Sequence, residues 1–385
     1  MNKFLSTWSA LVLCLLMAAF LIGCGGVSAN TPPPTPTPTP NPSPSPNPSP
    51  SPTPTPTAAH GTFVFVNGVE VVNQPTDTYR LNPDGTLTLA AGSPFPVSGM
   101  LASSGSFLAV ASGNSVTSYR VDATTGVPTA AGNAQVNSSQ AVAADAHDIY
   151  VAGLSADGAN WVLYGFSIAG NGLLKPLAGS PFQLAGTCEL CATPVSIGLN
   201  NSFVVVGMSG FEGAGGILAL PRAANGTLGA AQPGGVNESG SVAVQPNGNA
   251  AFAIDGSLGS IDSWTLDAAG HTTSGSGVPP STLTFIDEAV DPTGKFLLAV
   301  DNTGVVHIFM VGANATLSQI GTSEAVGGGV DRIVFDPSGH FVFVTQTSPD
   351  QLTVFSFDPA SAAMKKLPAT YPIGKLSVHI AIVSE

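Results

Sequence analysis

A small set of charged residues stands at the start of short apolar runs that are typical of strands. Asp287 and Glu288 open one run, Asp331 and Arg332 open the next, and Glu238 lies ahead of an earlier one. Carboxylates held close together have raised pKa values and can act as general acid or base. We therefore take Asp287, Glu288 and Arg332 as candidate catalytic residues, and Asp331 and Glu238 as candidate ligand-binding residues. The alternative is that Arg332 pairs with Asp287 or Asp331 and only neutralises the site.

Two further aspartates follow apolar runs at equivalent positions of neighbouring repeats. Asp255 and Asp301 could contact a ligand or a cation from the same rim of the molecule. Aspartates in such places also often cap a turn through their own backbone. Both interpretations stay open from the sequence alone.

Motifs for metal or cofactor binding are not found in the sequence. His307, His340 and His379 lack the spacing of a metal motif. The sequence also has no Gly-x-Ser-x-Gly, no Walker loop and no EF-hand loop. We therefore predict neither a metal site nor a bound cofactor.

An internal repeat must position these residues. Strand-like runs begin at Phe63, Phe107, Ile149, Phe203, Ala250, Phe296 and Phe341, at spacings of 44, 42, 54, 47, 46 and 45 residues. Periods of this length with short β runs are typical of propeller blades. A second strand with alternating polarity follows each run, and a Gly-containing turn follows most of those. The sequence predicts an all-β, seven-bladed β-propeller over residues 60–385.

The first repeat lacks an inner strand, because its chain begins directly at Phe63. The C-terminal run Leu376 to Val383 is an apolar strand with no partner behind it. We expect this strand to pair with the run at Phe63 and close the ring, which would remove an open sheet edge.

The first 23 residues are typical of an export signal, with Lys3 followed by a short apolar stretch. Leu21-Ile22-Gly23-Cys24 resembles the lipobox of bacterial lipoproteins. That resemblance implies that Cys24 is lipidated and becomes the first residue of the mature chain. The following Gly25, in place of Asp, favours the outer membrane of the cell envelope. The alternative is an ordinary signal peptide or anchor with an incidental cysteine.

Residues 24–59 form the lipidated N-terminus and a proline-rich linker. Residues 31–57 hold 14 of the 33 prolines and no charged residue. Proline lacks an N–H and pushes its predecessor to extended geometry, so we expect a disordered, polyproline-like spacer. At about 3.1 Å per residue it spans on the order of 80 Å. A ligand for SH3-type domains is the alternative.

Cys188 and Cys191 form a Cys-x-x-Cys motif in the longest repeat. Such a motif could be redox-active or supply half of a zinc site. No second pair accompanies it, because Cys14 lies in the signal and Cys24 in the lipobox. An exported chain favours a structural disulfide between Cys188 and Cys191.

Composition restricts the partners. Only 9% of the 385 residues are charged, and the ten Lys and Arg against 23 Asp and Glu give a net charge of −13. Ten cations are too few to form a basic surface that follows a phosphate backbone. We therefore expect no nucleic-acid partner. The composition also argues against a coiled coil or a helical bundle.

The chain resembles the lactonase-like seven-bladed propellers, which include 6-phosphogluconolactonases, and the YVTN-repeat surface proteins. The segments that carry the resemblance are 91–96 (AGSPFP), 178–182 (AGSPF), 331–339 (DRIVFDPSG), 343–346 and 354–358. The resemblance implies an Arg and a Gln in the site, at Arg332 and Gln346. It departs at 137–142, where the family carries a Pro-His pair and this chain has no His. His147 falls at the wrong end of the strand to replace it.

Two functions remain open at this point. The first is a non-catalytic module at the cell envelope that binds a glycan, a small anionic ligand or an envelope protein, as a monomer. The second is a lactone hydrolase with a diverged site, in which Arg332 binds an anionic substrate and a carboxylate acts as the base.

Overall fold

The structure is a computed structural model that describes residues 61–68, 74–184, 192–210, 216–235, 239–280, 282–374 and 379–384. The predicted signal peptide, Cys24, the proline-rich linker, Cys188, Cys191 and Glu238 lie outside these residues. The described residues form 29 strands and one three-residue 3₁₀ helix, η1 (Ala313–Ala315). No helix in these stretches is long and apolar enough to cross a membrane.

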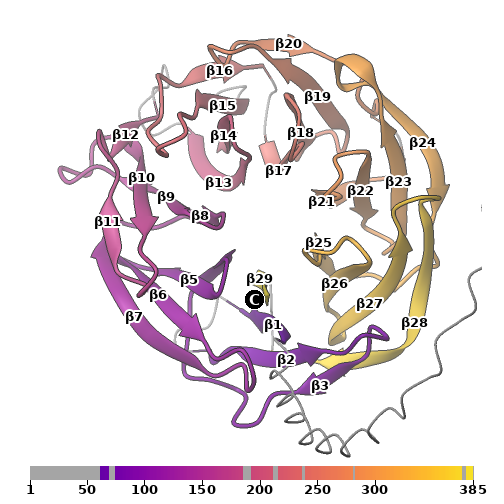
Figure 1. Cartoon of the computed structure of the whole chain (residues 1–385). Helices are drawn as coiled ribbons and strands as arrows, with labels where there is room; N and C mark the ends of the chain where they lie inside the picture. The colour runs from indigo at the N-terminus through magenta and orange to yellow at the C-terminus, as the bar shows by residue number, and fades with distance from the viewer. Residues whose placement is uncertain are drawn as a thin grey trace, which may run out of the picture. The chain divides into compact units, whose positions relative to one another are not determined.

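The strands form seven antiparallel sheets arranged in a ring, which confirms the predicted seven-bladed propeller (Figure 1). The innermost strands are β29 (His379–Ser384), β4 (Met100–Ser104), β8 (Ala141–Ala144), β13 (Ala192–Leu199), β17 (Ser239–Val244), β21 (Phe285–Val290) and β25 (Val330–Phe335). The second strands are β1 (Thr62–Asn67), β5 (Phe107–Ser112), β9 (Asp148–Leu154), β14 (Phe203–Gly210), β18 (Ala250–Asp255), β22 (Phe296–Asp301) and β26 (Phe341–Thr347). These two series correspond to blades 1 to 7 in this order.

The outer half of each blade is more varied. The third strands are β2 (Asp77–Leu81), β6 (Ser115–Val121), β10 (Trp161–Ile168), β15 (Gly216–Pro221), β19 (Ile261–Leu266), β23 (Val306–Val311) and β27 (Asp350–Asp358). The outermost strands are β3 (Leu87–Leu89), β7 (Pro128–Gln135), β11 (Leu174–Pro176), β12 (Phe182–Gln183), β16 (Gln232–Gly234), β20 (Thr272–Ser274), β24 (Leu317–Thr322) and β28 (Ala363–Pro372). Both β11 and β12 pair with β10 in blade 3.

The hydrophobic core lies between the blades, in seven clusters that each join two neighbours. One cluster packs Leu298 of blade 6 against Val344 and Phe355 of blade 7. The second strand of each blade contributes to both of its clusters, because it is covered on both faces. This explains why the repeat appears as a continuous apolar run, such as the fully buried β18 and β22, and not as an alternating one.

Strand β29 closes the ring as predicted. It pairs with β1 in register from Thr62↔Ser384 to Asn67↔His379, so blade 1 contains both the first and the last described strand. Tyrosine side chains add bonds between blades 1 and 7. The Tyr79 hydroxyl donates to the carbonyl of Pro372, and the Leu87 amide donates to the Tyr371 hydroxyl over 2.9 Å.

The recurring Phe and the recurring turn glycine contact each other across blade boundaries. Gly126 of blade 2 has φ +75° and lies so close to Phe63 of blade 1 that an added Cβ would meet the ring at 2.4 Å. Gly85 of blade 1 meets Phe341 of blade 7 in the same way, at 2.4 Å. Phe107 covers Gly172 of blade 3 in the same way, so three of the recurring Phe residues cover the glycine turn of the next blade.

Blade 3 replaces this Phe with Asp148, and an ion-pair cluster takes over the contact. Arg222 of blade 4 donates to Asp148 over 2.6 Å and also pairs with Asp145, while its guanidinium lies 5.4 Å from the Tyr150 ring centroid. The side chains of Arg222 and Asp148 are only 6% and 7% exposed. The cluster joins blades 3 and 4 in place of an apolar contact.

Candidate functional site

A cavity of about 610 Å³ lies on the axis of the propeller, and all seven innermost strands line it. Each strand contributes one residue of this lining at about the same level of its blade. We call this set the axial ring: His379, Met100, Ala141, Ser196, Ser241, Asp287 and Arg332, from blade 1 to blade 7. The ring is apolar on blades 2 and 3 and polar or charged elsewhere.

β-bulges accompany four of the polar ring members, whereas His379 lies in a regular pair. The register shifts next to Ser196, around Ser241, and directly before Asp287 and Arg332. A bulge inserts an extra residue and re-aims the neighbouring side chain. Blades 2 and 3 have no such shift in their inner pairs, and their ring positions are Met100 and Ala141.

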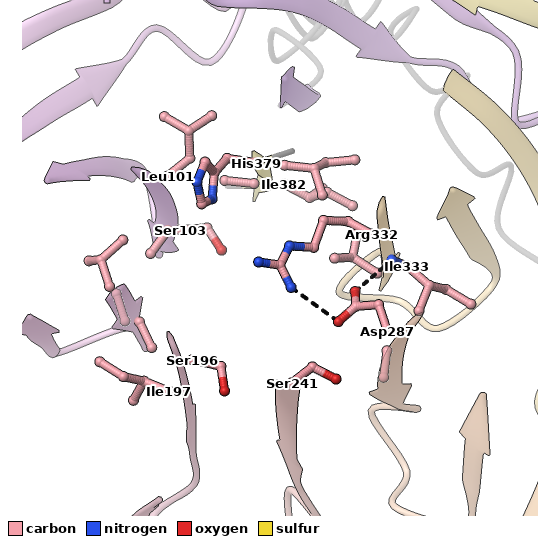
Figure 2. A pocket seen from close by; sticks show the side chains of 18 of the residues that line it. Leu101, Ser103, Ser196, Ile197, Ser241, Asp287, Arg332, Ile333, His379 and Ile382 are labelled. Carbon is pink, nitrogen blue, oxygen red and sulfur yellow. Dashed lines mark hydrogen bonds and ion pairs between the residues drawn. The ribbon is translucent and has the colours of Figure 1, made fainter. Parts of the chain in front are cut away.

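Asp287 and Arg332 form an ion pair at the edge of the cavity (Figure 2). Arg332 Nη1 lies 3.2 Å from Asp287 Oδ1, and Asp287 Oδ2 accepts the backbone N–H of Ile333 over 2.8 Å. The Asp287 side chain is 6% exposed, whereas Arg332 is 32% exposed and extends towards the middle of the cavity. Burial raises the pKa of Asp287, and the opposing charge of Arg332 offsets only part of that rise.

Glu288 is the neighbour of Asp287 but faces the opposite side of strand β21, towards blade 5. Among the described residues neither of its buried carboxyl oxygens meets the geometry of a hydrogen bond, although the Ala243 amide is close enough to favour the carboxylate. Burial, followed by the charges of Asp287 and Asp262, raises the pKa of Glu288 well above its usual range. Both effects favour the protonated form of the Glu288 carboxyl group.

His379 enters the cavity from the closing strand, beside Arg332 (Figure 2). Burial and then the positive charge of Arg332 lower the pKa of His379 to about 3. Its imidazole is therefore neutral at physiological pH. The sequence pointed to His379 only as a possible metal ligand and not as a residue of this cavity. The predicted pairing of Leu376 to Val383 with the first repeat was the signal that could have placed it in the ring.

The structure brings together Asp287, Glu288 and Arg332 of the predicted catalytic set. It places Asp255 and Asp301 in turns, and neither lines the cavity. Asp255 accepts the amides of Ser257 and Leu258, each over 2.9 Å. Asp301 accepts the Thr303 amide over 2.8 Å and pairs with His307 over 2.9 Å.

Gln346 and Asp331 also lie outside the residues that line the cavity. Gln346 is fully buried, where it donates to the Val326 carbonyl over 3.1 Å and accepts from Gln351 over 2.8 Å. It holds the chain ahead of strand β25 in place, so it can act on Arg332 only through the backbone. Among the described residues, no three His, Cys, Asp or Glu side chains gather as a metal site.

The structure also shows the segment 137–142, at the entry to blade 3, where the lactonase-like propellers carry a histidine and this chain does not. In blade 3, Gln140 lines the cavity and donates weakly to the Ser138 carbonyl over 3.4 Å. An imidazole therefore reaches this cavity from blade 1, through His379, and not from the entry to blade 3.

Comparison with solved structures places this architecture among known propellers. A protein of Bacteroides uniformis provisionally named a 6-phosphogluconolactonase superposes with a TM-score of 0.67 and 17% identity, over 84% of this chain and 100% of its own. The periplasmic gluconolactonase of Pseudomonas aeruginosa gives 0.65 and 16%, over 84% and 99%. The chain shares their fold. Apo AztD of Citrobacter koseri is similar at 0.54 and 11%, over 85% and 98%.

At these identities the similarity is one of fold, and the function has to be argued from the site. No protein-family model matches the sequence, and no curated protein matches it.

Proposed function

We propose that this chain is a non-catalytic binding module whose axial cavity takes a small anionic ligand. The observation that carries the proposal is the guanidinium of Arg332, which extends into a 610 Å³ cavity next to a neutral imidazole. Pockets of about 300–1,000 Å³ with few polar groups are typical of small-molecule sites. A guanidinium that is partly removed from water binds carboxylates and phosphates with charge-assisted hydrogen bonds.

The state of the two carboxyl groups favours binding over hydrolysis. A general base needs an ionised group within reach of the proton it removes. Both oxygens of Asp287 are engaged, by Arg332 and by the Ile333 amide. Glu288 also lines the cavity, but its raised pKa favours the protonated form, and the pKa of His379 is about 3. None of the three is a strong base towards a ligand in the cavity at neutral pH.

A lactone hydrolase is the second function that a specific observation favours. Arg332, Asp287 and His379 line the same cavity, in a fold shared with proteins named as gluconolactonases. In that case Arg332 would bind the anionic substrate, and movement of Asp287 away from Arg332 would free a base.

Anchoring at the cell envelope belongs to the same proposal and rests on the sequence. A lipid on Cys24 and the proline-rich linker would hold the propeller at a distance from the outer membrane as a monomer. Labelling of cells with palmitate should mark the wild-type protein and leave the C24S variant unlabelled. Palmitate on the C24S variant would contradict the lipidation site.

The binding function can be tested with the full chain and a panel of small carboxylates and phosphates in isothermal titration calorimetry. At least one anion should bind, and R332A should weaken it at least tenfold. R80A is the matched control, because Arg80 lies on strand β2 away from the cavity and its loss changes the charge equally. Equal effects of R332A and R80A would refute the role of the cavity.

A panel of lactones separates the two functions. Hydrolysis that depends on Arg332 and Asp287 would establish the enzyme and overturn the non-catalytic proposal. Anion binding without lactone turnover would support the binding module.

A further inference from the structure

We infer that the ligand of the axial cavity is a small carboxylic acid with an apolar body, such as an arylalkanoate. This inference rests on the proposed anion-binding function and names the class of ligand. It follows from three features of the cavity: its charge, the polarity of its walls and the placement of its hydroxyl groups.

The charge of the cavity suits a single negative charge. Arg332 is the only Lys or Arg among the described residues that line it. Asp287 already stands 3.2 Å from that guanidinium, Asp336 also lines the cavity, and His379 is neutral. A dianion such as a phosphate monoester would bring one negative charge more than a carboxylate into a cavity with a single guanidinium, which is strongly unfavourable at low dielectric. A carboxylate matches one guanidinium in both charge and shape.

The wall across the ring from Arg332 is mostly apolar, with Gln140 and Ser196 as its polar side chains. Blades 3 and 4 lie opposite blade 7 (Figure 1), and they present Ala141, Val142 and Ile197 to the cavity. Blade 2 adds Leu101 and blade 1 adds Ile382 (Figure 2). A ligand held at Arg332 must direct its remaining atoms against this wall. Hydroxyl groups placed there would lose water without gaining partners.

The hydroxyl groups of the axial ring also favour a ligand with an apolar body. The Oγ atoms of Ser196 and Ser241 line up next to the cavity, but they are buried and have no exposed surface. Gln140, the amide on blade 3, is directed to Ser138. Ser103 of blade 2 presents the lining hydroxyl that is not fully buried (Figure 2). A polyhydroxylated ligand finds few accessible partners beyond it, and the burial of apolar surface is the main contribution left to the cavity.

The test compares four probes with the full chain in isothermal titration calorimetry. The probes are 4-phenylbutyrate, gluconate, phenyl phosphate and 4-phenyl-1-butanol. We expect 4-phenylbutyrate to bind at least tenfold more tightly than each of the other three. The alcohol lacks the negative charge, and gluconate keeps the carboxylate but lacks the apolar body. Phenyl phosphate keeps an apolar ring and adds a second negative charge.

Variants connect this preference to the two walls. R332A should weaken 4-phenylbutyrate at least tenfold, and R332K should weaken it less, because lysine keeps the charge and loses the planar fork. I197T should weaken 4-phenylbutyrate severalfold and leave gluconate unchanged. I320T is the matched control, because Ile320 is 48% exposed on an outer strand. Melting curves verify that each variant is folded.

The outcomes separate this inference from the function on which it rests. If gluconate or phenyl phosphate binds as tightly as 4-phenylbutyrate and depends on Arg332, the ligand class is wrong and the anion-binding function stands. If no anion binds in a manner that depends on Arg332, both are overturned.

Discussion

Asp287 and Glu288 are adjacent in the chain, and the strand turns them into two different chemical groups. Asp287 faces blade 7 and keeps an ion pair with Arg332 and a bond from the Ile333 amide. Glu288 faces blade 5 and has no comparable partner among the described residues. Alternation along the strand therefore separates one carboxyl group that is engaged in an ion pair from one that is buried without a comparable partner. Both raised pKa values have burial as their largest cause.

Replacement of Glu288 by Gln should stabilise the protein at neutral and alkaline pH. A carboxyl group whose pKa is raised on folding stabilises fully below its unfolded pKa, and this contribution is lost as the pH rises through the folded value. E288Q should therefore raise the melting temperature by about 2 °C or more at pH 8 and have little effect at pH 4. Melting curves at the two pH values measure this. E324Q, at an exposed glutamate, is the control. Destabilisation by E288Q at pH 8 would contradict the prediction.

His379 should make the fold sensitive to acid. Its pKa is about 3 in the folded chain and 6.5 without its surroundings. Between these values the unfolded chain binds a proton that the folded chain does not, so stability falls as the pH drops from 6.5 towards 3. One such group contributes up to about 1.4 kcal/mol per pH unit.

H379Q should flatten the pH dependence of the free energy of unfolding in that window, as measured by urea denaturation. H147Q replaces an exposed turn histidine and should leave the slope unchanged. Parallel profiles for H379Q and the wild type would show that the imidazole is protonated in the folded chain.

At the scale of elements, neighbouring blades contact each other through the turn between the third and fourth strands. At three boundaries the glycine of this turn lies under an aromatic ring of the preceding blade, as Gly126 does under Phe63. The contact fixes the distance between the blades. A Cβ on the glycine would clash with the ring, and a smaller side chain in place of the Phe would leave a gap. Arg222 and Asp148 keep this boundary between blades 3 and 4 by an ion pair.

G126A should destabilise the propeller by more than its backbone conformation alone requires. The left-handed conformation costs an alanine about 1–2 kcal/mol. Overpacking against Phe63 adds roughly 1–3 kcal/mol. G105A is a matched control, because Gly105 has φ +55° but nothing within 4 Å of an added Cβ. Urea denaturation should give a larger loss of unfolding free energy for G126A, and equal losses would refute the contact.

The sequence predicted the elements better than it predicted the site. The seven copies of the apolar run, their spacing and the unpaired C-terminal strand lead directly to the ring, because the second strand of each blade is apolar on both faces. The association of Asp287, Glu288 and Arg332 also followed, because equivalent positions of a repeat must meet at the axis. The role of His379 could not be read locally, since it depends on pairing with Asn67 across more than 300 residues.

The orientation of the carboxyl groups was equally out of reach. The bulge between Phe285 and Asp287 decides which of Asp287 and Glu288 faces Arg332. No residue type at that position predicts the bulge. The turn bonds of Asp255 and Asp301 were among the open alternatives, and the structure shows them.

At the scale of the whole molecule, closure by β29 holds the ring together. The six residue pairs between β29 and β1 are the only sheet contact between the two ends of the described chain. Removal of β29 would leave the buried strand β1 as an open edge next to the axis, and open edges with apolar faces promote association.

Deletion of residues 379–385 should therefore abolish cooperative unfolding and produce oligomers. Size-exclusion chromatography with light scattering measures the mass, and circular dichroism melting measures the transition. The full chain at the same concentration is the reference. A monomeric truncated chain with an unchanged melting temperature would refute the role of closure.

The pairing of β29 with β1 also sets an order of events during synthesis. Blades 2 to 7 each come from one continuous segment, so each can form as its segment leaves the ribosome. Blade 1 has to wait with three strands until the C-terminal strand has been made. Because that strand carries His379, the axial cavity is the last part of the molecule to be assembled. Occupancy of the cavity would therefore report that translation has passed the final strand.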